Sequence, residues 1–305
     1  MSKSQARRTR LAIALAVIYL VWGSSFLATK IMVTDEPPLV AAGLRFSAAG
    51  LLLLAFAYWR SGPPVISRLE LRHVLAVGFL SVLFSNACHV IAMQYVQSNT
   101  AALLNATPTL WIAWLGTLGR RRSDLSGSAR AGLLLGFVGV VLVLAPKGGI
   151  QLAGLGWQLL ILLGCLGWSL GTIYYRNAGA ANPPMMFAAL QMLAGGLGLL
   201  GAAWVSEGSL AIHWTPRGLL AFTWLALMSS CLAYTAYAWL TMHATPVVIG
   251  SYGYVIPVIA ALLGWLLLDE TLSWLQIAGM LVILLGTALV TELLRPMPRI
   301  PEERA

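Results

Sequence analysis

The chain has 305 residues, of which 59% are hydrophobic and only 10% are charged. Soluble domains carry about a quarter charged residues, so this composition excludes an ordinary soluble protein and indicates an integral membrane protein. The net charge of +9 gives no reason to expect a nucleic-acid partner, because basic loops at the lipid headgroups account for it.

Ten apolar stretches follow one another along the chain, each long enough to cross a hydrocarbon core of about 30 Å as a helix of about 20 residues. They cover residues 11–33, 38–59, 73–95, 99–118, 130–146, 154–175, 184–205, 217–241, 247–268 and 274–293. The first stretch is too long for a signal peptide, and no cleavage site is evident. Because the connections are short, we expect an all-α integral membrane protein with ten transmembrane helices.

Basic residues gather in every second connection, which predicts the orientation of the chain. With the N-terminus inside, fifteen of the nineteen Lys and Arg residues fall in cytoplasmic segments, three fall on the opposite side, and Arg45 lies within a stretch. Short loops rich in Lys and Arg stay on the cytoplasmic side. We therefore expect a multi-pass protein of the cell inner (plasma) membrane with both termini in the cytoplasm, residues 296–305 forming a tail.

The two halves of the sequence resemble each other. WGSSFLATK at 22–30 matches WSLGTIYYR at 168–176, 146 residues later, and the same offset carries the double proline at 37–38 onto 183–184. Each half holds five stretches, an odd number, so the second copy would enter the membrane from the opposite face. We predict two inverted-topology repeats of five helices, residues 1–148 and 149–295. The alternative is chance similarity among apolar helices.

Several motifs resemble those of a known family. They are Trp22-Gly23-Ser24-Ser25-Phe26, the double proline Pro37-Pro38 followed by Arg45-Phe46, and Asp269-Glu270-Thr271-Leu272-Ser273 followed by Gly279 and Gly286. These motifs are similar to those of the EamA-type, ten-helix branch of the drug/metabolite transporter superfamily, and the resemblance covers essentially the whole chain.

The resemblance implies alternating access around a central cavity lined mainly by helices 1 to 4 and 6 to 9. Within the branch, the chain looks most like bacterial exporters of aromatic and other neutral amino acids. The resemblance is specific for the fold and weak for the substrate, since members of the superfamily export amino acids, other metabolites and cationic drugs.

Polar and aromatic side chains inside the stretches are the candidates for such a cavity. Asn86 and His89 share a helix face, and Tyr234 and Tyr237 repeat their spacing 148 residues later. A polar face opposite a tyrosine-rich face suits a ligand with an apolar side chain and a polar or zwitterionic backbone. The predicted substrate-binding residues are Trp22, Asn86, His89, Asn105, Trp168, Ser230, Tyr234, Tyr237 and Tyr254.

Interhelical packing is the alternative for each of these residues. Ser, Asn and Tyr often join helices in bilayers by hydrogen bonds of about 0.6 kcal/mol. His89 is either a neutral interior histidine or a proton relay. Trp22 and Trp168 lie midway along their stretches, which favours cavity walls over the interfacial aromatic belt.

Pro108 and Pro257 lie about ten residues into their stretches, where a proline removes a backbone hydrogen bond. Paired hinges suit a rocking transporter, and static kinks are the alternative.

Arg45 lies about 10 Å below the end of its helix, where a charge is costly by about 3 kcal/mol or more. No acidic residue lies in the central part of a stretch, so we expect no buried ion pair. Two interpretations stay open: a structural arginine bound by carbonyl groups, or an arginine that attracts carboxylate-bearing substrates. The matching residue of the second half, Gln191, is uncharged.

Enzyme and metal chemistry have little basis in the sequence. The four histidines have no metal-ligand spacing, and the three cysteines form no C-x-x-C pair. We therefore expect no enzyme activity, cofactor or metal. Because no intramembrane carboxylate is present, passive, gradient-driven export is a serious alternative to ion coupling, and coupling through His89 or through backbone sites stays open.

The leading hypothesis is an exporter of small amphipathic metabolites, above all neutral or aromatic amino acids. Its partners would be the small-molecule substrate and the lipid bilayer, and the protein would act as a monomer or homodimer. The alternatives are a transporter of the same fold for cationic drugs, nucleotide sugars or lipid intermediates, and a membrane enzyme or scaffold.

Overall fold

Every regular element of the protein is helical in the computed structural model, which describes residues 3–118, 126–144, 154–243 and 252–290. The all-α prediction is thus confirmed for this part of the chain. The elements are α1 (Lys3–Asp35), α2 (Pro38–Ser61), α3 (Arg68–Val77), η1 (Gly78–Phe84), α4 (Ser85–Met93), α5 (Ser98–Leu104), α6 (Pro108–Gly116), α7 (Gly127–Leu144), α8 (Leu155–Ala178), α9 (Pro184–Glu207), α10 (Pro216–Thr223), η3 (Trp224–Ala233), α11 (Tyr234–His243), α13 (Tyr252–Leu268) and α14 (Trp274–Val290).

Seven helical segments of the described residues are long and apolar enough to cross a membrane. They are Thr9–Asp35, Pro38–Ser61, Arg68–Met93, Gly127–Leu144, Leu155–Ala178, Pro184–Ser206 and Pro216–Tyr237. Two shorter apolar helices, Val255–Leu268 and Trp274–Val290, lie where the last two stretches are predicted. The predicted stretch at 99–118 is divided into α5 and α6.

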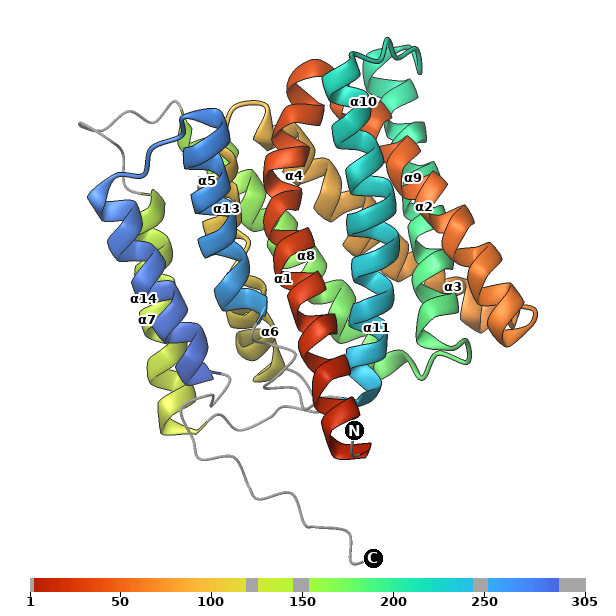
Figure 1. Cartoon of the computed structure of the whole chain (residues 1–305), viewed down its shortest axis with the longest axis horizontal. Helices are drawn as coiled ribbons and strands as arrows, with labels where there is room; N and C mark the ends of the chain where they lie inside the picture. The colour runs from red at the N-terminus through yellow and green to blue at the C-terminus, as the bar shows by residue number, and fades with distance from the viewer. Residues whose placement is uncertain (1–2, 119–125, 145–153, 244–251, 291–305) are drawn as a thin grey trace, which may run out of the picture.

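The helices form two tight pairs that flank the rest of the bundle. Figure 1 shows α7 beside α14 at one side and α2 beside α9 at the other, and these two pairs make the most extensive contacts in the protein. Helix α1 lies between the pairs and contacts α13, α10, η3 and α11. The centre of the bundle therefore combines elements from both ends of the chain.

Glycine allows both pairs to approach closely. A Cβ at Gly50 of α2 would lie 2.7 Å from the Leu193 nitrogen, and one at Gly196 of α9 would lie 2.6 Å from the Ser47 nitrogen. In the other pair, a Cβ at Gly139 would lie 2.8 Å from the Gly279 carbonyl oxygen. Lipid gives helices no hydrophobic reason to associate, so close backbone contact of this kind stabilises the pairs.

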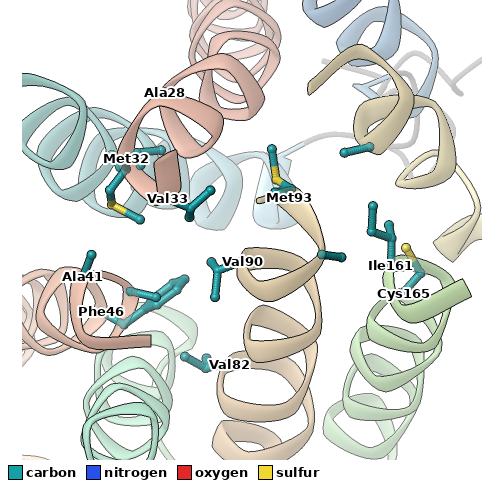
Figure 2. Close-up of a cluster of buried hydrophobic side chains, with 14 of the residues drawn as sticks. Ala28, Met32, Val33, Ala41, Phe46, Val82, Val90, Met93, Ile161 and Cys165 are labelled. Carbon is teal, nitrogen blue, oxygen red and sulfur yellow. The ribbon is translucent and has the colours of Figure 1, made fainter. Parts of the chain in front are cut away.

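A buried cluster of aliphatic and sulfur-containing side chains joins α1, α2, η1 and α4 next to the centre of the bundle (Figure 2). Met32, Phe46, Val82, Val90 and Met93 are each at most 4% exposed. Such a cluster fixes the positions of these helices, because protein interiors are close-packed and resist changes of volume. Arg45 directly precedes Phe46 in α2, so the cluster also fixes the backbone position from which the Arg45 side chain extends.

Three buried glutamates join loops that are distant in the sequence. The Glu36 carboxylate accepts a hydrogen bond of 2.7 Å from the Thr215 backbone nitrogen, and Glu70 accepts one of 2.8 Å from Asn182 Nδ2. Glu270 accepts three, from Ser98 N, Ser98 Oγ and Asn99 N. A carboxylate at a helix N-terminus satisfies backbone amides that have no partner within the helix.

Local features of the first half recur in the second half. Helices α2 and α9 both end at a glycine of positive φ, Gly62 at 79° and Gly208 at 68°. Helices α3 and α10 are both capped by a hydroxyl, Ser67 accepting from Glu70 N and Thr215 accepting from Gly218 N. Helix α3 continues directly into the π-helical segment η1, and α10 continues into the π-helical segment η3.

Alanine at Gly139 tests the close contact of α7 with α14. The added methyl group would meet backbone atoms of Ile283 and Gly279, which cannot rotate away, so we expect a loss of about 1–3 kcal/mol in the free energy of unfolding. The control is Gly127→Ala in the same helix, where nothing lies within 4 Å of the new Cβ. Thermal unfolding in detergent measures both variants, and equal unfolding temperatures would contradict the close contact.

Candidate substrate-binding cavity

A cavity of about 170 Å³ lies at the centre of the bundle, among elements of both halves of the chain. Its walls come from α1, α2, α4, α6, α8, η3, α11 and α13, and from residues 105–106 between α5 and α6. Seven of the residues singled out in the sequence line it: Trp22, Arg45, Asn105, Pro108, Trp168, Tyr234 and Pro257.

Aromatic rings form one wall around Trp22 of α1. The Trp22 ring meets Tyr234 edge-on at 5.7 Å between ring centroids and Tyr252 edge-on at 5.4 Å. Tyr237 does not line the cavity but contacts Trp22 at 5.5 Å and Tyr252 at 6.1 Å. Edge-to-face pairs add about 0.5–1.5 kcal/mol to the effect of burial, so this wall is fixed before any ligand enters.

Trp22 is also anchored by a hydrogen bond. Its indole Nε1 donates to the Ser229 carbonyl oxygen of η3 at 3.2 Å. In a π-helix the amide hydrogen bonds run from i to i+5, and such segments are frequent at functional sites. The aromatic wall and η3 are therefore held in a fixed relation to each other.

Arg45 enters the cavity from α2 and is the only charged side chain among the described residues that line it. Its Nε donates to Ser230 Oγ at 3.1 Å and its Nη2 to Ser229 Oγ at 3.4 Å. The guanidinium carbon lies 4.6 Å from the centroid of the Phe46 ring. Ser230, predicted to bind substrate, instead binds Arg45 and is fully buried.

His89 and Asn105 form a polar network next to the cavity. His89 Nδ1 lies 2.8 Å from the Ser85 carbonyl oxygen, which only accepts, so Nδ1 carries a hydrogen. His89 Nε2 lies 3.0 Å from Asn105 Oδ1. A protonated ring donates from Nε2 to that oxygen, whereas a neutral ring with its hydrogen on Nδ1 requires the Asn105 amide to turn so that its nitrogen donates to Nε2. The protonation of His89 is thus linked to the orientation of Asn105, which lines the cavity.

Two residues predicted to bind substrate, Asn86 and Tyr254, are not among the described residues that line the cavity. Asn86 does not line the cavity; its Nδ2 donates to the Ser81 carbonyl oxygen at 3.1 Å, within the π-helical turn that precedes it. Tyr254 belongs to α13, but its side chain lies outside the described residues.

The two prolines occupy different backbone settings. Pro108 begins α6 after a turn at residues 105–107, and the Leu104 carbonyl oxygen accepts from the Thr107 nitrogen at 3.1 Å. Pro257 lies inside α13, so the Gly253 carbonyl lacks its usual helical donor. Gly253 and both prolines line the cavity.

Several lining residues were missed by the sequence analysis. They are Ser25, Phe26, Ser85, Ala106, Thr109, Ser229, Tyr252, Gly253 and Ile256. Ser85 and Ser229 lie at or within the π-helical segments, where the extra residue in each turn rotates the following face and the 3.6-residue period fails. Three signals in the sequence pointed to some of these residues: Ser25 and Phe26 belong to the motif that begins at Trp22, Ser229 adjoins Ser230, and Tyr252 lies two residues before Tyr254.

The described residues contain no cluster of side chains suited to bind a metal ion. Within the part of the chain that the structure describes, no three His, Cys, Asp or Glu residues lie close enough together to hold a metal ion. The three cysteines are free thiols, and Cys165 contacts the Asn105 amide at 3.5 Å.

An apolar helical bundle around a small, mixed aromatic and polar cavity is the architecture expected of a multi-pass membrane transporter. A model of the EamA-like transporter family matches residues 10–145 and again residues 155–292. The chain belongs to this family and is a membrane transporter rather than an enzyme.

Individual relatives agree with this assignment. The "uncharacterized inner membrane transporter YedA" of Escherichia coli K12 is 34% identical over 91% of this chain and 89% of its own. The "uncharacterized transporter YvbV" of Bacillus subtilis is 27% identical over 94% and 93%, and "protein PecM" of Dickeya dadantii 27% over 90% and 89%. The similarity to inner membrane transporters supports a multi-pass inner membrane protein.

A solved crystal structure shows the same fold. It is 20% identical in sequence, has a TM-score of 0.66, and the match covers 93% of this chain and 97% of that one.

Replacement of Trp22 tests the aromatic wall. Trp22→Ala removes contacts with three tyrosines, and we expect a loss of roughly 3 kcal/mol in the free energy of unfolding. Trp22→Phe keeps an aromatic ring but loses the hydrogen bond to Ser229, so we expect a loss of about 1 kcal/mol in the free energy of unfolding. Trp204→Ala, at a side chain 60% exposed, is the control and should change stability by less than about 0.5 kcal/mol. Equal unfolding curves for the two alanine variants would refute this role.

Proposed function

We propose that the protein exports small amphipathic metabolites, above all neutral or aromatic amino acids, by alternating access around the central cavity. The observation that carries the proposal is the cavity itself, which is lined by aromatic rings from both halves of the chain together with neutral polar groups and one cation. Aromatic faces suit an apolar side chain, and the polar groups suit an amino-acid backbone.

The size of the cavity supports a small substrate. Its volume of about 170 Å³ is below the roughly 300–1,000 Å³ of pockets for drug-sized ligands. Nucleotide sugars and lipid intermediates exceed such a volume, and a phosphate would call for several convergent cations. Arg45 is the single cation among the described lining residues.

A second pocket supports an exit toward one end of α1. It has a volume of about 300 Å³ and is lined by Lys30, Asp35, Arg217 and Glu270, among others. Lys30 follows Trp22 by eight residues, about 12 Å along the helix. A charged pocket so close to the cavity fits a vestibule in which a leaving solute is hydrated again.

The proposal includes ten membrane spans in two inverted five-helix repeats, with the division near residue 148. Paired features support it: Gly62 with Gly208, Ser67 with Thr215, and η1 with η3. The loop contacts support it too, because Glu36–Thr215, Glu70–Asn182 and Glu270–Ser98 each join loops that this topology places on one side.

Both termini are proposed to lie in the cytoplasm. Arg10 and Arg60 line one groove, whereas Lys30 and Arg217 line the pocket described above, so these basic residues separate by side as the topology requires. Short basic loops favour the cytoplasmic side.

Reporter fusions test this orientation. Green fluorescent protein at the C-terminus should fluoresce and alkaline phosphatase there should be inactive, since the phosphatase folds only outside the cytoplasm. Phosphatase joined after residue 149 should be active. An active phosphatase at the C-terminus would reverse the topology.

Counterflow in liposomes tests the transport activity. Purified protein in liposomes loaded with unlabelled phenylalanine should accumulate labelled phenylalanine, saturably and without an ion gradient, and protein-free liposomes should not. A panel of neutral amino acids then ranks the substrates. Folded protein that exchanges none of them would refute the amino-acid assignment, and the family membership would stand.

A further inference from the structure

Among the described residues, no anionic group pairs with the guanidinium of Arg45, which contacts two serine hydroxyls and the Phe46 ring. The side chain is 8% exposed, and among the described residues its hydrogen-bond partners are the hydroxyls of Ser229 and Ser230. Neither hydroxyl is an anion, and no described carboxylate pairs with the guanidinium. A guanidinium stays protonated at any pH at which proteins work. Among the described residues, the positive charge of Arg45 at the cavity wall therefore has no negative partner.

Such a charge is costly in a membrane interior. Charged side chains there almost always pair with one another or with backbone carbonyls, or they face a water-filled cavity, and they mark substrate or ion pathways. The structure gives Arg45 no carbonyl partner among the described residues, and it places the side chain at the cavity wall. These contacts argue against the interpretation that Arg45 is a structural residue bound by carbonyl groups.

The guanidinium is held with one edge free. Nε and Nη2 are occupied by the two serines, whereas Nη1 donates to no described group. Because Ser229 and Ser230 are consecutive residues of η3 and are at most 3% exposed, they fix the plane of the guanidinium. A planar guanidinium with free N–H groups matches the geometry of a carboxylate or a phosphate, and an amino acid carries the carboxylate.

The same π-helical segment joins this cation to the aromatic wall. The Ser229 hydroxyl binds Arg45, and the Ser229 carbonyl oxygen accepts from Trp22 Nε1. One residue thus sets the position of the charge relative to the rings of Trp22 and Tyr234, which line the same cavity. A ligand with a carboxylate next to an apolar or aromatic body meets both features at once.

We propose that the free edge of Arg45 is a carboxylate-binding subsite, so that the cavity selects solutes bearing a carboxylate and rejects amines that lack one. The proposal rests on the proposed function and specifies its substrate class. A zwitterionic amino acid qualifies through its carboxylate, and a simple aromatic acid qualifies as well. An amine without a carboxylate meets a like charge in a medium of low dielectric, so cationic drugs are excluded.

Wild-type protein tests the subsite with four related ligands. L-Phenylalanine and 3-phenylpropionate carry the carboxylate; L-phenylalaninamide and 2-phenylethylamine share the ring and lack it. We expect the two carboxylates to raise the unfolding temperature in detergent at concentrations at least tenfold lower than the other two, with sodium acetate at equal ionic strength as the blank. Equal effects of the amide and the acid would overturn the proposal.

Variants assign the effect to Arg45. Arg45→Gln introduces the residue found at the matching position 191 and should abolish the preference for carboxylates. Arg45→Lys keeps the charge but loses the planar fork, and should weaken carboxylate binding at least threefold while keeping the order of the ligands. The control is Arg60→Gln on the same helix, where the side chain is exposed and outside this cavity, and it should bind as wild type does.

Each outcome bears on one claim. A preference retained in Arg45→Gln refutes the subsite; if that variant does not fold, Arg45→Lys and the wild-type ligand series decide. Binding of carboxylates without any flux in liposomes refutes the proposed transport of amino acids and leaves the subsite intact. Flux of phenylalaninamide equal to that of phenylalanine refutes the subsite and leaves the transporter intact.

Discussion

The need to satisfy every backbone amide and carbonyl inside a hydrocarbon layer governs the whole structure. Helices meet this need along most of the chain, and irregular backbone is tolerated at membrane depth only where protein or a water-filled cavity surrounds it. The turn at residues 105–107 satisfies its amides by tighter bonds, such as Thr107 N to Leu104 O at 3.1 Å. That turn lines the cavity, as does Gly253 before Pro257. Departures from regular helix therefore lie where the solute would bind.

The π-helical segment η3 combines two functions that would otherwise need separate elements. Its consecutive residues Ser229 and Ser230 hold the Arg45 guanidinium, and the Ser229 backbone holds the indole of Trp22. Wider turns are energetically poorer than α-helical ones, so they persist where surrounding contacts determine them. The guanidinium of Arg45 and the indole of Trp22 are consequently held by η3 in a fixed relation to each other.

The two halves share a framework and differ in chemistry. Caps, terminal glycines and π-helical segments recur, yet Arg45 corresponds to Gln191, and Pro108 starts a helix where Pro257 interrupts one. Features that recur are those that shape the bundle. Three of the residues at which the halves differ, Arg45, Pro108 and Pro257, line the cavity.

The helical class, the apolar segments and the family motifs follow from the amino-acid sequence, because hydrophobic runs and basic loops are local properties of the chain. The sequence also indicated Trp22, Asn105, Trp168 and Tyr234, whose polar or aromatic character stands out within apolar stretches. The sequence could not show that Ser230 binds Arg45, that the Asn86 side chain donates to a π-helical carbonyl, or that Tyr252 lines the cavity. These outcomes depend on helix rotation, which one extra residue in a turn changes, and on partners up to 185 residues away.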